Sequence, residues 1–107
     1  MTNYSKGANF ERSICADLTQ RGALCVRAAG SHGIADVIAI WPNGPAWLIQ
    51  AKTNGKMSGA DMRELGRTAH AYGMVPVKAS RPKRGKLLYE RYHSFANSGY
   101  QWSELTP

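Results

Sequence analysis

The sequence has few acidic residues, few cysteines and no long apolar run. It contains 7 Asp and Glu against 14 Lys and Arg, a formal net charge of +7. Its two cysteines are too few for a disulfide framework. No apolar run approaches the roughly 20 residues that span a bilayer, and the first residues hold no apolar signal core. We therefore expect no membrane partner, and a reducing location: the cytoplasm, in association with the nucleoid, or the cytoplasm of a virus-infected host cell.

The excess of positive charge is confined to one part of the chain. Residues 52–91 hold ten Lys and Arg and only three Asp and Glu, while the two signs balance elsewhere. This distribution indicates a polyanionic partner, with nucleic acid first and an anionic membrane surface second. The length of 107 residues predicts a single domain with a thin core, so a large cleft would be shared with a second subunit.

The hydrophobic pattern predicts an α/β fold. A single mixed five-stranded sheet flanked by helices, in the order α-β-β-β-α-β-β, accounts for the alternation of helical and strand patterns. We expect a nuclease domain over 1–93 and leave 94–107 as an unassigned tail. The predicted helices are 6–21 and 58–73, and the predicted strands are 23–27, 34–40, 46–52, 75–79 and 87–91.

Glu11 lies where the first helix should be apolar. At about 100° per residue it falls between Leu18 and Cys15 in the buried stripe, where an unpaired carboxylate is unfavourable. The structural explanation is an ion pair with a buried arginine, such as Arg12 or Arg27. The functional explanation is a carboxylate that holds a water or a metal.

Asp36 interrupts the second strand in the same way. It shares one side of the strand with Ile34, Ile38 and Ile40, which suggests a buried face. An acid that caps a loop or turn is the structural alternative.

The third strand supplies partners for Asp36. Gln50 and Lys52 point to one side of that strand, and a hairpin turn over Pro42–Pro45 brings them opposite Asp36. Lys52 alone would be an ordinary solvated lysine. A carboxylate, an amide and an ammonium at one edge of a hairpin favour a functional site.

This group of residues suits a hard cation. Mg²⁺ prefers oxygen ligands and often takes only one or two carboxylates, together with waters and substrate phosphate. Asp36 and the Gln50 side-chain carbonyl offer two oxygens, and the backbone carbonyl of Ala51 offers a third. The predicted cofactor is Mg²⁺, with Mn²⁺ as the alternative. Lys52 would orient the attacking water or offset developing charge, and Glu11 would hold a water or a second metal.

Five segments follow one another in a characteristic order: Lys6-Gly-Ala-Asn-Phe-Glu-Arg12, Arg27-Ala-Ala-Gly-Ser31, Ile34-Ala-Asp36, Gln50-Ala-Lys52 and Ala71-Tyr-Gly-Met-Val-Pro-Val77. Together they resemble the archaeal-type Holliday-junction resolvases of the PD-(D/E)xK nuclease superfamily, over about residues 6–92. The resemblance implies a homodimer whose two metal-dependent sites make paired nicks across a four-way DNA junction. Carried over by position, the catalytic set is Glu11, Asp36, Gln50, Lys52 and the loop residue Ser31.

Two positions depart from the family pattern. Ala35 stands in place of the usual proline, which shapes the strand and does no chemistry. Gln50 stands in place of the usual acid, which would weaken Mg²⁺ binding, lower activity or shift the preference toward Mn²⁺. Gln-x-Lys also resembles the second half of the motif in Mrr-like restriction nucleases. We interpret His32 as a solvated loop histidine and not as a general base.

The basic residues are assigned to two roles. Arg63, Arg67 and His70 follow one another at helical spacing, which fits a solvated face. The cations of 81–86 lie on a turn and favour phosphate contacts, with a flexible surface loop as the alternative. The residues assigned to DNA contact are Lys6, Arg12, Arg27, Lys56, Arg81, Lys83, Arg84 and Lys86.

The sequence therefore predicts an Mg²⁺-dependent endodeoxyribonuclease that resolves four-way junctions in branched double-stranded DNA. A restriction- or repair-type nuclease of the same fold, acting on duplex or flap DNA, is the first alternative. A DNA-binding homologue without catalytic activity is the second.

Overall fold

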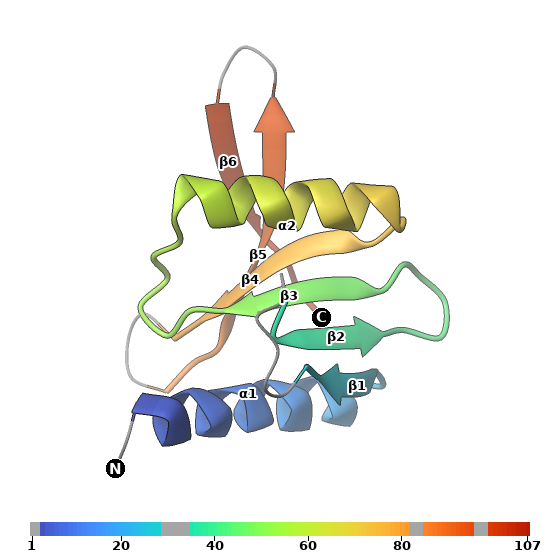
Figure 1. Cartoon of the computed structure of the whole chain (residues 1–107). Coiled ribbons are helices and arrows are strands. Elements are labelled where there is room, and N and C mark those ends of the chain that lie inside the picture. Colours follow the sequence, from blue (N-terminus) through green and yellow to red (C-terminus); the bar gives the residue numbers. More distant parts are fainter. Residues whose placement is uncertain (1–2, 29–34, 82–84, 96–98) are drawn as a thin grey trace.

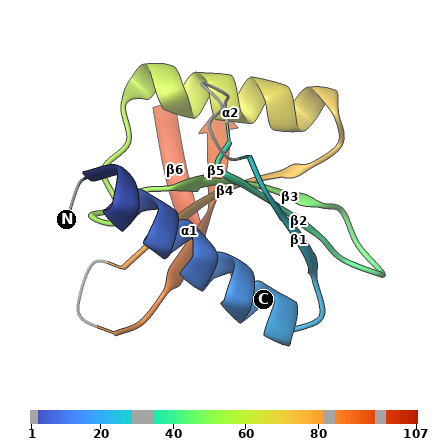
Figure 2. The same ribbon diagram turned by 60° about the horizontal axis from the view of Figure 1, so that its bottom comes forward.

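The computed structural model describes residues 3–28, 35–81, 85–95 and 99–107. One mixed sheet separates two helices, α1 on one face and α2 on the other (Figures 1 and 2). No helix within these ranges is both long enough and apolar enough to cross a membrane. The elements, in chain order, are α1 (Asn3–Gln20), β1 (Leu24–Arg27), β2 (Val37–Ile40), β3 (Trp47–Ala51), α2 (Gly59–Ala71), β4 (Val75–Ser80), β5 (Leu88–Phe95) and β6 (Gly99–Glu104).

The strands lie in the sheet in the same order as in the sequence. Every neighbouring pair is antiparallel except β3 and β4, which are parallel and joined by α2. A parallel pair needs a crossover long enough to return to the same edge of the sheet, and a helix provides it. The mixed α/β architecture predicted from the sequence is thus confirmed.

The sheet has six strands where five were expected. The sixth, β6, lies in the segment that the sequence left unassigned, and β5 runs across the 93/94 boundary chosen for the tail. Trp102 on β6 packs on Tyr92 of β5, with ring centroids 5.2 Å apart. Contacts of this kind, and not a local pattern, define the strand.

One face of the sheet packs on α1. Phe10, Ile14 and Leu18 form the buried stripe of the helix, and alternate residues of the strands, such as Val37 and Ile49, complete this cluster. Cys15 and Cys25 are free thiols, partly buried against the same cluster. Burial, with the adjacent Cys15, raises the pKa of the Cys25 thiol to about 12, so this group stays protonated at neutral pH.

The other face packs on α2, which lies over β3, β4 and β5. The helix begins after Ser58, whose hydroxyl accepts a hydrogen bond from the Asp61 amide at 3.1 Å, as expected for a capping residue. Leu65 and Ala69 are its fully buried residues. Gly66 allows close approach to the sheet, because a Cβ there would lie 2.7 Å from the Tyr92 ring.

On the α2 side of β1 and β2, Ile38 packs against the cluster under α2, but the rest of this face is open. Leu24, Val26 and Ile40 are 65%, 50% and 43% exposed. They lie on one face because Leu24 is paired with Ile40 and Val26 with Ile38, while the alternate residues of these strands pack toward α1. We call Leu24, Val26, Ile38 and Ile40 the β1–β2 apolar face.

This exposure corrects one prediction. The sequence predicts that Asp36 and three isoleucines share the buried face of this strand. In the structure the fully buried residues of β2 are instead Val37 and Ala39, which lie on the opposite face. Asp36 itself precedes β2, which begins at Val37. The reason is that α2 packs farther along the sheet and leaves this part open. Ile34 lies outside the described residues.

A hydrogen bond joins α1 to β5. The Tyr89 hydroxyl donates a hydrogen bond to Asp17 at 2.7 Å, and Arg21 holds the same carboxylate at 3.3 Å. Burial, together with this carboxylate, raises the pKa of the Tyr89 hydroxyl. The contact connects residues 72 positions apart in the sequence, so it ties the first helix to the far half of the sheet.

Replacing Tyr89→Phe should lower the free energy of unfolding by about 1 kcal/mol, the lower end for a hydrogen bond to a partly exposed charged group. Urea denaturation followed by circular dichroism measures the change. Tyr72→Phe is the matched control, since Tyr72 is 74% exposed, and should leave stability unchanged. Equal stability of both variants would show that the Asp17 contact contributes nothing net.

Candidate active site

The candidate site lies where β2 begins beside the end of β3. Val37 pairs with Ile49, so the next step of the antiparallel register sets Asp36 opposite Gln50. The Asp36 carboxylate accepts a hydrogen bond from the Ala51 amide at 2.8 Å, and the Asp36 amide donates to the carbonyl of Ile49 at 2.8 Å. Asp36 is therefore joined to the Gln50-Ala51-Lys52 segment, as the hairpin predicted.

Gln50 and Lys52 differ in their surroundings. Gln50 is 9% exposed and is the register partner of Lys78 on β4. Lys52 leaves the strand and is more open, with its amide bonded to the Ala79 carbonyl at 2.9 Å. Its ammonium lies 3.9 Å from Asp61 on α2, and both side chains are partly exposed. Such a pair is weak, so the Lys52 ammonium is available to a phosphate.

Glu11 is held by an arginine on the α1 side of the sheet, whereas Gln50 and Lys52 face the α2 side. Arg27 on β1 lies 3.3 Å from the Glu11 carboxylate, and both side chains are mostly buried. The adjacent Ala28 amide donates to the Asp36 carbonyl at 2.9 Å, which places this ion pair next to the start of β2. Of the two partners that the sequence allowed, Arg27 is the one found, whereas Arg12 contacts Asn9 at 3.0 Å.

The donor set fits a hydrated hard cation. The Ala51 amide uses one lone pair of the Asp36 carboxylate, which has about four such positions, so the carboxylate can also bind a metal. The Gln50 amide oxygen and the Ala51 carbonyl are neutral oxygen donors. Within the described ranges, no three His, Cys, Asp or Glu side chains come together. These oxygens would therefore hold Mg²⁺ or Mn²⁺ together with several waters, not in an all-protein cage.

The residues assigned to DNA contact come from several elements and loops. Arg81 follows β4; its amide donates to the Thr53 carbonyl at 3.0 Å, and its guanidinium lies 5.6 Å from the centre of the Phe10 ring. Lys56 and Lys86 are exposed. Lys6 belongs to α1, but its side chain is not described. Ser31, His32, Lys83 and Arg84 lie outside the described residues.

Lys78 was not singled out by sequence analysis, although it adjoins Gln50. It is 7% exposed; its ammonium donates to the Gly55 carbonyl at 2.8 Å and lies 3.5 Å from Glu90. The ring of Trp102 is 4.3 Å away. The available signal was its position between the buried Val77 and Ala79, where a lysine needs partners.

Comparisons with known proteins identify the family. The chain matches the solved 1.6 Å structure of Hjc from Archaeoglobus fulgidus, a Holliday junction resolvase from an archaeal hyperthermophile, with a TM-score of 0.70 and 19% identity. The match covers 92% of this chain and 84% of that one, and at this identity it establishes a shared fold. A search of curated proteins found no match. The profile of the archaeal Holliday junction resolvase (Hjc) family matches residues 2–89, and the chain therefore belongs to that family.

Proposed function

We propose that this protein is a metal-dependent endodeoxyribonuclease that resolves four-way DNA junctions by paired nicks. Membership of the resolvase family supports the class of reaction. The observation that supports the location of the site is the 2.8 Å hydrogen bond between Asp36 and the Ala51 amide. It brings the acid of the motif to the Gln-x-Lys segment.

The residues have distinct roles in this proposal. Asp36, Gln50 and the Ala51 carbonyl hold the cation, which when bound would offset the negative charge that develops on the scissile phosphate. Lys52, partly exposed and only loosely paired with Asp61, orients the attacking water or stabilises the same charge. Ser31 stays a predicted loop residue near the phosphate.

Glu11 has a positioning role in this scheme. Its carboxylate is already paired with Arg27, so it is a poor candidate for a second strong metal ligand. By holding Arg27, whose neighbour Ala28 donates to the Asp36 carbonyl, it keeps a cation near the start of β2. Arg12, Arg81, Lys56 and Lys86, together with the predicted contacts Lys6, Lys83 and Arg84, bind the backbone of branched DNA.

Two nicks across one junction require two sites, and we propose a homodimer. The β1–β2 apolar face supports this assembly, because three of its side chains are between 43% and 65% exposed and β1 is an edge strand. A two-fold dimer buries the same patch on both subunits. The sequence alone did not indicate such a patch.

One experiment separates the proposed function from its alternatives. Purified protein is incubated with a labelled four-way junction, a Y-fork and linear duplex, each with Mg²⁺, Mn²⁺ or EDTA. The proposal predicts paired cuts in the junction with a divalent metal and none with EDTA. Equal cutting of duplex would favour a restriction- or repair-type nuclease, and binding without any cutting would favour a DNA-binding homologue.

Asp36→Asn should reduce junction cleavage at least about 100-fold, the scale seen when one charge-stabilising group is lost, while junction binding persists. Asparagine can still accept the Ala51 hydrogen bond, so the change removes charge and leaves the hairpin intact. Lys52→Ala should act similarly. Single-turnover cleavage measures the first effect and electrophoretic mobility shift the second. Glu104→Gln, an exposed acid on β6, is the control. If both variants lose junction binding, Asp36 and Lys52 serve the fold and not catalysis.

Gln50→Glu tests the neutral position in the motif. A carboxylate there adds a charged oxygen ligand, so the Mg²⁺ concentration for half-maximal cleavage should fall several-fold. The neighbouring Lys78 ammonium makes the new charge tolerable. Cleavage rates over a Mg²⁺ titration provide the measurement. An unchanged or higher Mg²⁺ requirement, in a protein with unaltered circular dichroism, would contradict a metal-binding role for Gln50.

Leu24→Glu should dissociate the dimer, because a carboxylate on the β1–β2 apolar face would be buried there without a partner. Sedimentation velocity is expected to show monomer, and junctions should be nicked on one strand at a time. Asn43→Glu, in the exposed turn between β2 and β3, is the control and should remain dimeric. A dimeric Leu24→Glu variant would place the subunit contact elsewhere.

A further inference from the structure

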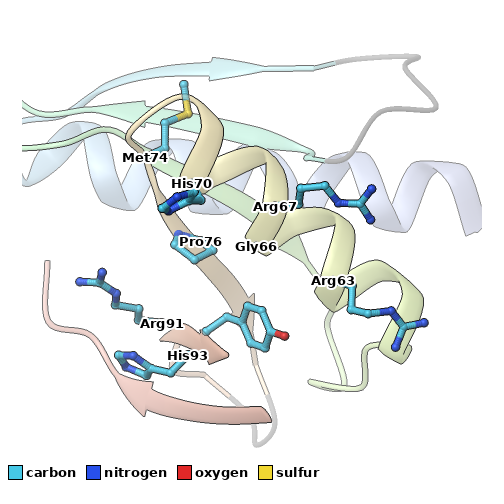
Figure 3. Close-up of a pocket in the computed structure, with 9 residues that line it drawn as sticks. Arg63, Gly66, Arg67, His70, Met74, Pro76, Arg91 and His93 are labelled. Atoms are coloured by element: carbon cyan, nitrogen blue, oxygen red, sulfur yellow. The ribbon is translucent and has the colours of Figure 1, made fainter. Parts of the chain in front are cut away.

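A basic groove lies between α2 and β5, separate from the candidate active site. It has a volume of about 540 Å³ and is lined by Arg63, Arg67 and His70 from the helix and by Arg91 and His93 from the strand. Figure 3 shows Arg91 and His93 across the groove from His70, with Arg63 and Arg67 extending outward along the helix. We call it the α2–β5 groove.

The floor of this groove is fixed by close packing. Gly66 leaves no Cβ between the helix and the Tyr92 ring, and a Cβ there would approach that ring to 2.7 Å. Tyr92 is 4% exposed and packs beside Trp102, its register partner on β6. The floor is therefore rigid. Because the Tyr92 ring is buried, a DNA base cannot stack on it, and a ligand would contact the cations at the rim.

These cations form a row along the helix. Arg63, Arg67 and His70 recur at intervals of four and three residues, which places them on one side of α2. Seven residues span about 10 Å of helix axis at 1.5 Å per residue. Arg91 and His93 of β5 also line the groove, on either side of Tyr92, and the His93 ring is hydrogen-bonded to the Ser103 hydroxyl at 2.7 Å.

Little negative charge compensates this groove. None of the described residues that line it is acidic. Glu64, one position from the row, lies 3.1 Å from Arg67, but both side chains are largely exposed, and such a pair is weak.

The shape of the groove favours a linear anion. It is open and elongated, and guanidinium groups lie along its length, as suits a series of phosphates. About 10 Å of helix matches roughly three phosphates, at about 3.4 Å per nucleotide along one strand. A compact anion would need donors converging on one point, and here the arginines diverge (Figure 3).

The α2–β5 groove and the candidate active site face different sides of α2. Asp61, which lies 3.9 Å from Lys52, is two positions before Arg63 and thus about 200° away around the helix. A phosphate in the groove would belong to another part of the DNA than the phosphate being cut.

We propose that the α2–β5 groove binds the phosphate backbone of a duplex arm, remote from the cleavage point. This inference rests on the proposed function, because it assumes a branched DNA substrate. It gives a role to the helical row Arg63, Arg67 and His70, which the sequence suggested to be an ordinary solvated face. The groove would extend the contact to DNA without selecting a base sequence, since phosphates hold no sequence information.

The test compares the double variant Arg67→Gln/Arg91→Gln with the unaltered protein, and binding is measured in EDTA so that cleavage plays no part. Long-armed junctions should bind about tenfold more weakly at ~0.1 M salt, and the slope of log K against log salt should fall by about 0.9 for each lost phosphate contact. Junctions with arms too short to reach the groove should bind both proteins equally.

Arg21→Gln is the control, because Arg21 lies at the end of α1 and is paired with Asp17. It should leave the salt slope unchanged. An unchanged slope for the double variant, or an equal loss with short and long arms, would overturn the proposal. If the unaltered protein cuts no DNA with any metal, the proposed function fails, while arm-dependent binding would still be measured.

Discussion

The register of the β2–β3 hairpin is the constraint on which the candidate site depends. Side chains alternate along a strand, so a slip of one residue would turn Gln50 and Lys52 to the opposite face. The Asp36 carboxylate fixes the register from its own side by accepting the Ala51 amide at 2.8 Å. Asp36 can thus serve both as an acid that caps the neighbouring strand and as a metal ligand. One oxygen holds the strand while the carboxylate keeps capacity for a cation.

The two helices divide the molecule into parts with different tasks. α1 covers β1 to β3 and α2 covers β3 to β5, so each face of the sheet has one region without a helix. On the α2 side that region is apolar and is proposed to join two subunits. The edge of α2 that faces β5 is basic and is proposed to hold DNA. The candidate active site lies between them, at the end of the strand that both helices share.

Sequence reasoning recovered the parts of the fold that depend on local pattern. The capping Ser58, the hairpin turn over Pro42–Pro45 and the alternation along the strands were sufficient for the element order and for the meeting of Asp36 with Gln50 and Lys52. β6, the burial of Lys78 and the Tyr89–Asp17 contact were not foreseen, since each depends on residues distant in the sequence. The exposure of Ile40 was misjudged for the same reason, because it depends on where α2 lies over the sheet.

The close seat of α2 on Tyr92 has a mechanical consequence. A glycine inside a helix normally lowers stability by up to about 1 kcal/mol relative to alanine, yet Gly66 lets the helix backbone rest directly on an aromatic ring. With no flexible side chain between them, α2 cannot tilt without displacing the Tyr92 ring, which also packs beside Trp102 of β6. Asp61 and Arg63 near one end and His70 at the other belong to one rigid body. A rigid-body movement of α2 would therefore carry its basic side and Asp61 together.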